Sequence, residues 1–77
     1  MTRAENVLRW LRGGKDRRLV WNGLKRAYKP VDPDDVMAVK KLGMVGYKVV
    51  DHLCEAGHVE PHHRPLLPTE YWPVGDG

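Results

Sequence analysis

Apolar residues near the start of the chain recur at the spacing of one helical face. They lie at positions i, i+3, i+4 and i+7, and they are Ala4, Val7, Leu8 and Leu11. Thr2 can cap such a helix with Glu5 three residues later, and Gly13-Gly14 can end it. The pattern therefore predicts a helix over residues 2–12.

A second amphipathic helix is predicted from Asp16, a plausible N-cap, to about residue 28. Its inward positions would be Val20, Leu24, Ala27 and Tyr28. A polar stripe at i, i+4, i+7 and i+11 would form the opposite side: Arg18, Asn22, Lys25 and Lys29. This segment is interpreted as a basic amphipathic helix, which Pro30 would end.

Two further helices follow from the next turn signals. Asp32-Pro33-Asp34-Asp35 has a capping residue, proline at the first helical position and carboxylates in the first turn, so a helix is expected from there to Leu42. A tight connection at residues 43–46 precedes a helix from Tyr47 to about Ala56, which Gly57 would stop.

The last twenty residues have a different composition, with four of the six prolines of the chain. Val59 and residues 70–72 could pair as a short β-ribbon, with residues 61–68 as its loop. The chain is thus expected to be mainly α, with a helical core over residues 1–60 and a proline-rich wing or arm over residues 61–77. At 77 residues it is expected to form a single domain.

Residues 36–59, VMAVKKLGMVGYKVVDHLCEAGHV, resemble the helix-turn-helix core of winged-helix DNA-binding domains. The resemblance rests on Leu42-Gly43-Met44, on Val49 with Leu53, and on the passage from Leu53 to Val59, which has the form Leu-x-x-Ala-Gly-x-Val. It implies a small winged helix-turn-helix-like domain, with three to four short helices and a short β-wing or extended arm. It also implies sequence-specific binding of double-stranded DNA by a small regulator, of the kind found among phage repressors and excisionase-like factors.

Charge is divided along the chain although the net charge is only +3. Residues 1–30 hold nine Lys and Arg against two acidic residues, whereas residues 31–77 hold four against eight. Such an asymmetry indicates an anionic partner for the first half, head-to-tail self-association, or two ordinary solvated surfaces.

The DNA-binding hypothesis assigns roles to thirteen residues. Phosphates would be held by Arg17, Arg18, Lys25, Arg26, Lys29, Lys40 and Lys41. Base edges would be addressed by Tyr47, Lys48 and His52, and the backbone or minor groove would be reached by His62, His63 and Arg64. The outward face of residues 47–56 is nearly neutral, which is unusual for a recognition helix. The small footprint favours a homodimer.

Two other classes of function stay open. A protein-binding inhibitor or adaptor could dock its basic half on an acidic protein partner. An RNA-binding module could use the expected basic helix, and exposed aromatic residues on a basic surface would favour it. An enzyme is not expected, because the sequence has no legible catalytic triad, phosphate loop or paired carboxylates, and no cofactor is expected either.

Zinc-ligand residue types cluster late in the chain: His52, Cys54, His58, His62 and His63. Paired ligand motifs of the kind typical for zinc are missing, so Cys54 is interpreted as a small buried hydrophobic residue and no metal site is expected. A single cysteine also favours the reducing cytoplasm. No apolar run approaches the ~20 residues of a membrane helix, so no membrane partner is expected.

Overall fold

The computed structural model describes residues 2–74 and contains three helices. They are α1 (Arg3–Arg12), α2 (Val36–Leu42) and α3 (Tyr47–Glu55). Five strands complete the fold: β1 (Arg18–Asn22), β2 (Ala27–Val31), β3 (Val45–Gly46), β4 (Val59–His62) and β5 (Glu70–Pro73). Within the described part of the chain, none of the helices combines the length and apolar character needed to cross a membrane.

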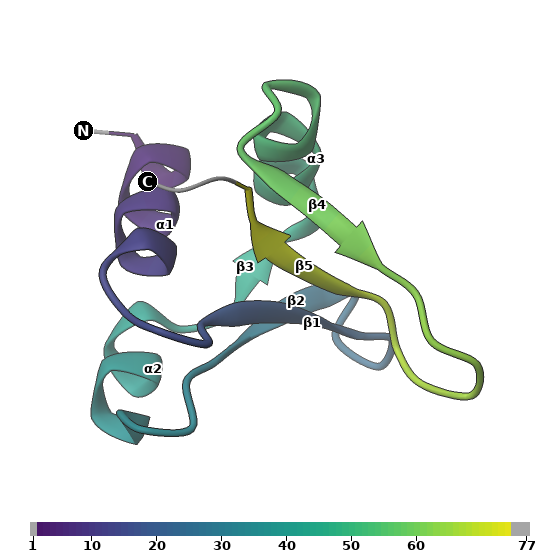
Figure 1. The fold of residues 1–77 in the computed structure, drawn as a ribbon, viewed down its shortest axis with the longest axis horizontal. Helices are drawn as coiled ribbons and strands as arrows, with labels where there is room; N and C mark the ends of the chain where they lie inside the picture. Colours follow the sequence, from purple (N-terminus) through teal and green to yellow (C-terminus); the bar gives the residue numbers. More distant parts are fainter. Residues whose placement is uncertain (1, 75–77) are drawn as a thin grey trace.

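The strands form one antiparallel sheet in the order β3-β2-β1-β5-β4, with α1 and α3 above it in Figure 1. The prediction of a mainly α fold is therefore wrong, because the protein is a small α/β domain. The β4–β5 ribbon belongs to the same sheet as the N-terminal half, since β5 pairs with β1 through Leu19 and Tyr71.

The largest error concerns residues 16–28, which form a β-hairpin instead of a basic helix. β1 and β2 pair with Leu19 opposite Pro30 and Trp21 opposite Tyr28. The turn between them begins at Asn22, whose Oδ1 accepts hydrogen bonds from the backbone N–H groups of Leu24 and Lys25. Leu24, expected to point inward, is 98% exposed at this turn.

The hairpin changes where the expected basic stripe lies. Arg18 and Val20 share one sheet face because side chains alternate along a strand, and Lys29 joins them because it pairs with Val20. Lys25 lies in the exposed turn, away from that face. The stripe therefore divides between a sheet face and a turn, and it is not one side of a helix.

A single hydrophobic core lies between the helices and the sheet. Its members come from α1, α3 and one face of the sheet: Val7, Leu11, Leu19, Tyr28, Val45, Val50, Leu53 and Val59. α1 contributes its apolar stripe, and Thr2 caps that helix by accepting a hydrogen bond from the Glu5 N–H. The predicted helix over residues 2–12 and the predicted ribbon of Val59 with residues 70–72 are both present.

The start of α2 differs from the prediction by one turn. Asp35 caps this helix by accepting a hydrogen bond from the Ala38 N–H, so Pro33 lies outside it.

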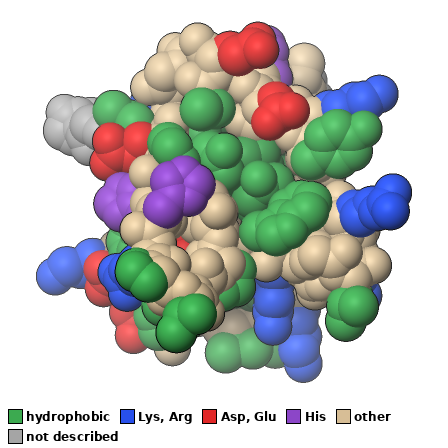
Figure 2. All heavy atoms as spheres, turned by 90° about the vertical axis from the view of Figure 1, so that its right-hand side faces the viewer, with side chains coloured by type: hydrophobic (Ala, Val, Ile, Leu, Met, Phe, Trp, Pro, Cys, Tyr) green, Lys and Arg blue, Asp and Glu red, His purple; other side chains and the backbone are tan. Residues whose placement is uncertain are grey.

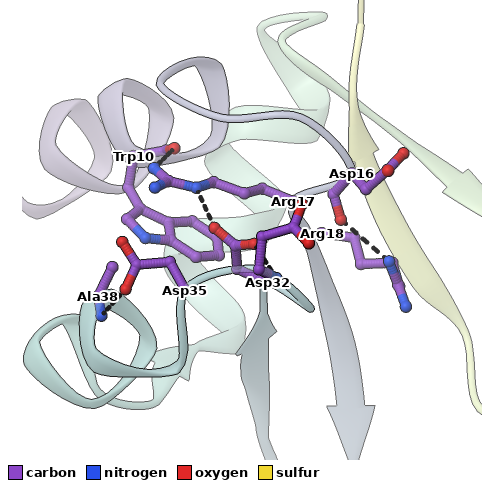
Figure 3. Close-up of polar contacts among 8 residues, drawn as sticks. Trp10, Asp16, Arg17, Arg18, Asp32, Asp35 and Ala38 are labelled. Atoms are coloured by element: carbon purple, nitrogen blue, oxygen red, sulfur yellow. Dashed lines mark hydrogen bonds and ion pairs between the residues drawn. The ribbon is translucent and has the colours of Figure 1, made fainter.

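Asp32, which was expected to cap α2, is instead buried, and its carboxylate accepts a 2.7 Å hydrogen bond from Arg17 Nε (Figure 3). Arg17 also donates to the carbonyl oxygen of Trp10 at 2.6 Å, and its guanidinium lies 4.9 Å from the centre of the Trp10 ring. This ion pair joins the end of α1 to the segment that follows β2.

Candidate nucleic-acid interface

An aromatic hollow of about 310 Å³ opens where three segments of the chain meet. The segments are the β1–β2 hairpin, the first residue of α3, and residues 63–71, which comprise the loop of residues 63–69 after β4 and the start of β5. Six residues line it: Trp21, Tyr28, Tyr47, His63, Thr69 and Tyr71. In Figure 1 the hairpin turn and this loop both lie on the right-hand side, which faces the viewer in Figure 2.

The register of the sheet brings the rings of the hollow together. Trp21 lies opposite Tyr28, with ring centroids 5.0 Å apart and ring planes at 60°. The Tyr71 ring meets Tyr28 edge to face, with centroids 5.3 Å apart. Trp21 also donates its backbone N–H to the carbonyl oxygen of Thr69 at 3.0 Å, which fixes the end of the loop beside β1. The aromatic cluster is thus held by strand pairing.

Two tyrosines that line the hollow differ in exposure. Tyr28 is only 8% exposed and belongs to the core, whereas Tyr47 is 49% exposed at the start of α3. Burial, and next the neighbouring Tyr71, raise the pKa of Tyr28 to about 12, so its hydroxyl stays protonated at neutral pH. Tyr28 can therefore act as a neutral hydrogen-bond donor or acceptor there.

Basic residues adjoin each segment of the hollow. The β1–β2 turn carries Lys25 and Arg26, Lys48 follows Tyr47, and Arg64 follows His63. All four are exposed, and within residues 2–74 none of them forms an ion pair. Figure 2 shows hydrophobic side chains in the middle of this face, with Lys and Arg side chains beside and below them and histidine on the other side. We call this surface, with the hollow and these four residues, the aromatic–basic face.

Acidic residues also lie near the aromatic–basic face. Asp51 and Glu55 are exposed on the second and third turns of α3, and Asp51 lies close enough to Tyr28 to contribute to its raised pKa. Figure 2 shows acidic side chains near the top of the face and others along its left-hand side, where Lys and Arg side chains also lie. An anionic ligand would be attracted to Lys48 at the start of α3 more than to the later turns that carry Asp51 and Glu55.

Two of the thirteen residues assigned from the sequence line the hollow, Tyr47 and His63, and four more are exposed next to its lining segments. The aromatic–basic face contains Lys25, Arg26, Tyr47, Lys48, His63 and Arg64. Lys40 and Lys41 are exposed on the last turn of α2, outside the hollow.

The other five lie elsewhere. Arg17 is held by Asp32, and His52 lies beside α1 in a shallow depression with Leu8 and His58. The remaining three, Arg18, Lys29 and His62, occupy the opposite sheet face. On that face Arg18 lies 5.1 Å from the centre of the Trp72 ring and 3.8 Å from a Glu70 oxygen. The His62 ring lies 5.7 Å from that of Trp72, and its Nε2 lies 3.2 Å from a Glu60 oxygen.

Four lining residues were missed from the sequence: Trp21, Tyr28, Thr69 and Tyr71. The available signal was the alternation of Leu19 with Trp21 and of Tyr28 with Pro30, around the turn dipeptide Asn22-Gly23. A hairpin interpretation would have placed Trp21 and Tyr28 opposite each other on one face.

The zinc-ligand types do not converge. Among the residues that the structure describes, no group of three or more His, Cys, Asp and Glu side chains could hold a metal ion. Cys54 is partly buried against the core.

Comparison with known proteins gives no relative. No family model, no curated protein and no solved structure matches this chain.

Proposed function

We propose that the protein binds double-stranded DNA through the aromatic–basic face, as a small regulator or excisionase-like factor. The observation that carries the proposal is that the start of α3, the β1–β2 turn and the loop of residues 63–69 adjoin one hollow, each with an exposed Lys or Arg beside it. Three projecting segments with cationic side chains suit a ligand that offers phosphates at several points around a groove. The resemblance of residues 36–59 to helix-turn-helix cores supports the same ligand.

Each segment has a distinct role in this arrangement. Lys25, Arg26 and Arg64 hold phosphates, because they are exposed cations on projecting loops. Tyr47 and Lys48, on the first turn of α3, address base edges. Arg17 has no part in the interface, since Asp32 and Trp10 hold its guanidinium. We also propose that the protein acts in the cytoplasm and binds as a homodimer, which the small size of the face favours.

A salt titration with charge-matched variants tests the proposal. The double variant Lys25→Gln/Arg26→Gln removes two cations from the face. The control Arg9→Gln/Arg12→Gln removes two exposed cations from α1, which lies on the other side of the molecule in Figure 1. Affinity for random and genomic duplexes is measured by fluorescence anisotropy from ~50 to ~200 mM salt, a range over which phosphate contacts are strongly screened.

The wild-type protein should lose affinity linearly on a log–log plot. The turn variant should lower the magnitude of the slope by about 2, because each phosphate contact contributes about 0.9 to it. The α1 variant should keep a slope close to that of the wild type. Equal slopes for the two variants, or no duplex binding at ~50 mM salt, would contradict the proposal.

A protein partner is the second candidate, and a different surface favours it. Val36 and Met37 on α2 are 60% and 66% exposed. Val36 lines a mainly apolar hollow of about 180 Å³ with Pro30, Val31 and Val39. Exposed apolar residues beside such a hollow are typical of protein-binding surfaces. If no duplex binds, the inhibitor or adaptor hypothesis becomes the first choice.

A further inference from the structure

We propose that the aromatic hollow receives one unpaired nucleobase of the bound nucleic acid, stacked among Trp21, Tyr47 and Tyr71. The inference rests on the proposed function and assigns a ligand group to the centre of its face. It requires that a base leave the helical stack and enter the hollow, while the adjoining phosphates contact the surrounding cations.

The rings give the hollow a floor and walls. Tyr28 is nearly buried, and the rings of Trp21 and Tyr71 both pack against it at 5.0 and 5.3 Å between centroids. Tyr47 lines the hollow from α3 and is about half exposed. A planar aromatic group can stack on these rings whatever its sequence identity, because every base has a π-face.

Polar groups within the hollow suit the edge of a base. Thr69 Oγ1 and His63 Nδ1 lie 3.2 Å apart, and both residues line the hollow beside the loop. Tyr28 and Tyr71 supply hydroxyls that can donate or accept a hydrogen bond. Thr69 and His63 pair with each other, and their remaining hydrogen-bonding capacity, with that of the tyrosine hydroxyls, suits a base, which offers donors and acceptors in its plane.

Size and charge select a nucleotide over other planar ligands. A volume of about 310 Å³ lies at the lower end of the ~300–1,000 Å³ typical of small-ligand sites, so the hollow suits one compact ring system. Lys48 and Arg64 are the sequence neighbours of the lining residues Tyr47 and His63. A base is joined to phosphates on both sides, so an adjoining phosphate can contact Arg64 while the base occupies the hollow and Lys48 addresses a base edge.

Three duplexes of one sequence test the inference. The first contains a single unpaired adenine, the second an abasic residue at the same position, and the third is fully paired. The unpaired adenine should bind about tenfold more tightly than either of the others, since stacking one base on aromatic side chains is worth about that factor. An unpaired base is also the cheapest to unstack.

Two variants localise the effect. Tyr47→Ala removes a half-exposed ring without opening the core, and it should abolish the preference for the unpaired adenine. Leu67→Ala, which truncates an exposed residue of the same loop outside the hollow, should retain the preference. In ¹H–¹⁵N spectra, the indole N–H resonance of Trp21 should shift with the unpaired-base duplex more than with the abasic duplex, while that of Trp10 should not.

The outcomes separate this inference from the function on which it rests. Equal affinities for the three duplexes, with the expected salt dependence, would overturn base capture and leave DNA binding intact. Failure to bind any duplex would overturn both. A preference that persists in Tyr47→Ala would also overturn the inference, because the base would then be recognised outside the hollow.

Discussion

Asp32 is the residue on which the connection between α1 and β2 depends. It is buried, pairs with Arg17 and accepts a second hydrogen bond from the Asp34 N–H. We expect Asp32→Asn to lower the urea midpoint of unfolding at neutral pH, because the partly buried guanidinium loses its counter-charge. Asp34→Asn, at an exposed neighbour, is the control and should leave the midpoint almost unchanged. Equal midpoints for all three proteins would contradict a structural role for the pair.

The same pair makes stability depend on pH in the acid range. The hydrogen bond from Arg17 holds the pKa of Asp32 below its usual value of 3.8. A carboxyl whose pKa is lower in the folded state stabilises the fold above its unfolded pKa, and this contribution disappears as the pH falls through the folded value. The urea midpoint of unfolding, measured from pH 7 to pH 2, should therefore decrease in the wild type once the pH is lower than about 4. The decrease should be smaller in Asp32→Asn.

Gly43 is the residue that the turn between α2 and α3 requires. Its φ of 74° and ψ of −174° lie in a region that is essentially restricted to glycine. Gly43→Ala should cost about 2 kcal/mol in free energy of unfolding, although its Cβ would meet no other atom within 4 Å. Gly46→Ala has the same open space and an ordinary φ of −64°, and because Gly46 is the N-cap of α3 it should cost about 0.5–1 kcal/mol, less than Gly43→Ala. Urea unfolding of both variants compares the two, and equal costs would exclude backbone strain as the cause.

At the scale of elements, the three helices that end near a glycine could be predicted from the sequence. Thr2 and Gly13 bound α1, and Gly43 and Gly57 follow α2 and α3, so these helices could be predicted to within a few residues. The β4–β5 pair could also be predicted, because prolines confine strand structure to residues on either side of them.

The hairpin was missed because its apolar residues fit two periods at once. Val20, Leu24 and Tyr28 are spaced as on a helix, while Leu19, Trp21, Tyr28 and Pro30 alternate as in paired strands. The turn dipeptide Asn22-Gly23 is the local signal for paired strands, and tertiary pairing with β5 and β3, which no local pattern reports, decides between the periods. The aromatic hollow depends on that pairing, so it could not be predicted while Trp21 and Tyr28 were placed on a helix.

Substitutions at Lys29 distinguish a strand from a helix in solution. Lys29 is exposed in β2, opposite Val20. Threonine favours strands and alanine favours helices, so Lys29→Thr should be more stable than Lys29→Ala by up to about 1 kcal/mol. Free energies of unfolding from urea titration compare the two variants directly. The reverse order would indicate that this segment is helical.

At the scale of the whole molecule, one small core of eight buried residues, without a disulfide, supports every projecting segment of the face. A ligand that binds only the folded chain therefore raises the melting temperature. At a free duplex concentration of 100 times Kd the gain is about 2.7 kcal/mol, or a shift of roughly 10–20 °C for a domain of this size.

Differential scanning fluorimetry with the preferred duplex measures this shift. Lys25→Gln/Arg26→Gln should show a smaller shift than Arg9→Gln/Arg12→Gln at the same duplex concentration, because only the first variant weakens the aromatic–basic face. A duplex that binds the wild type without raising its melting temperature would have equal affinity for the folded and unfolded chains. Such a result would mean that the positive charge of the chain, and not the arrangement of β1–β2, α3 and the loop of residues 63–69, is what the DNA recognises.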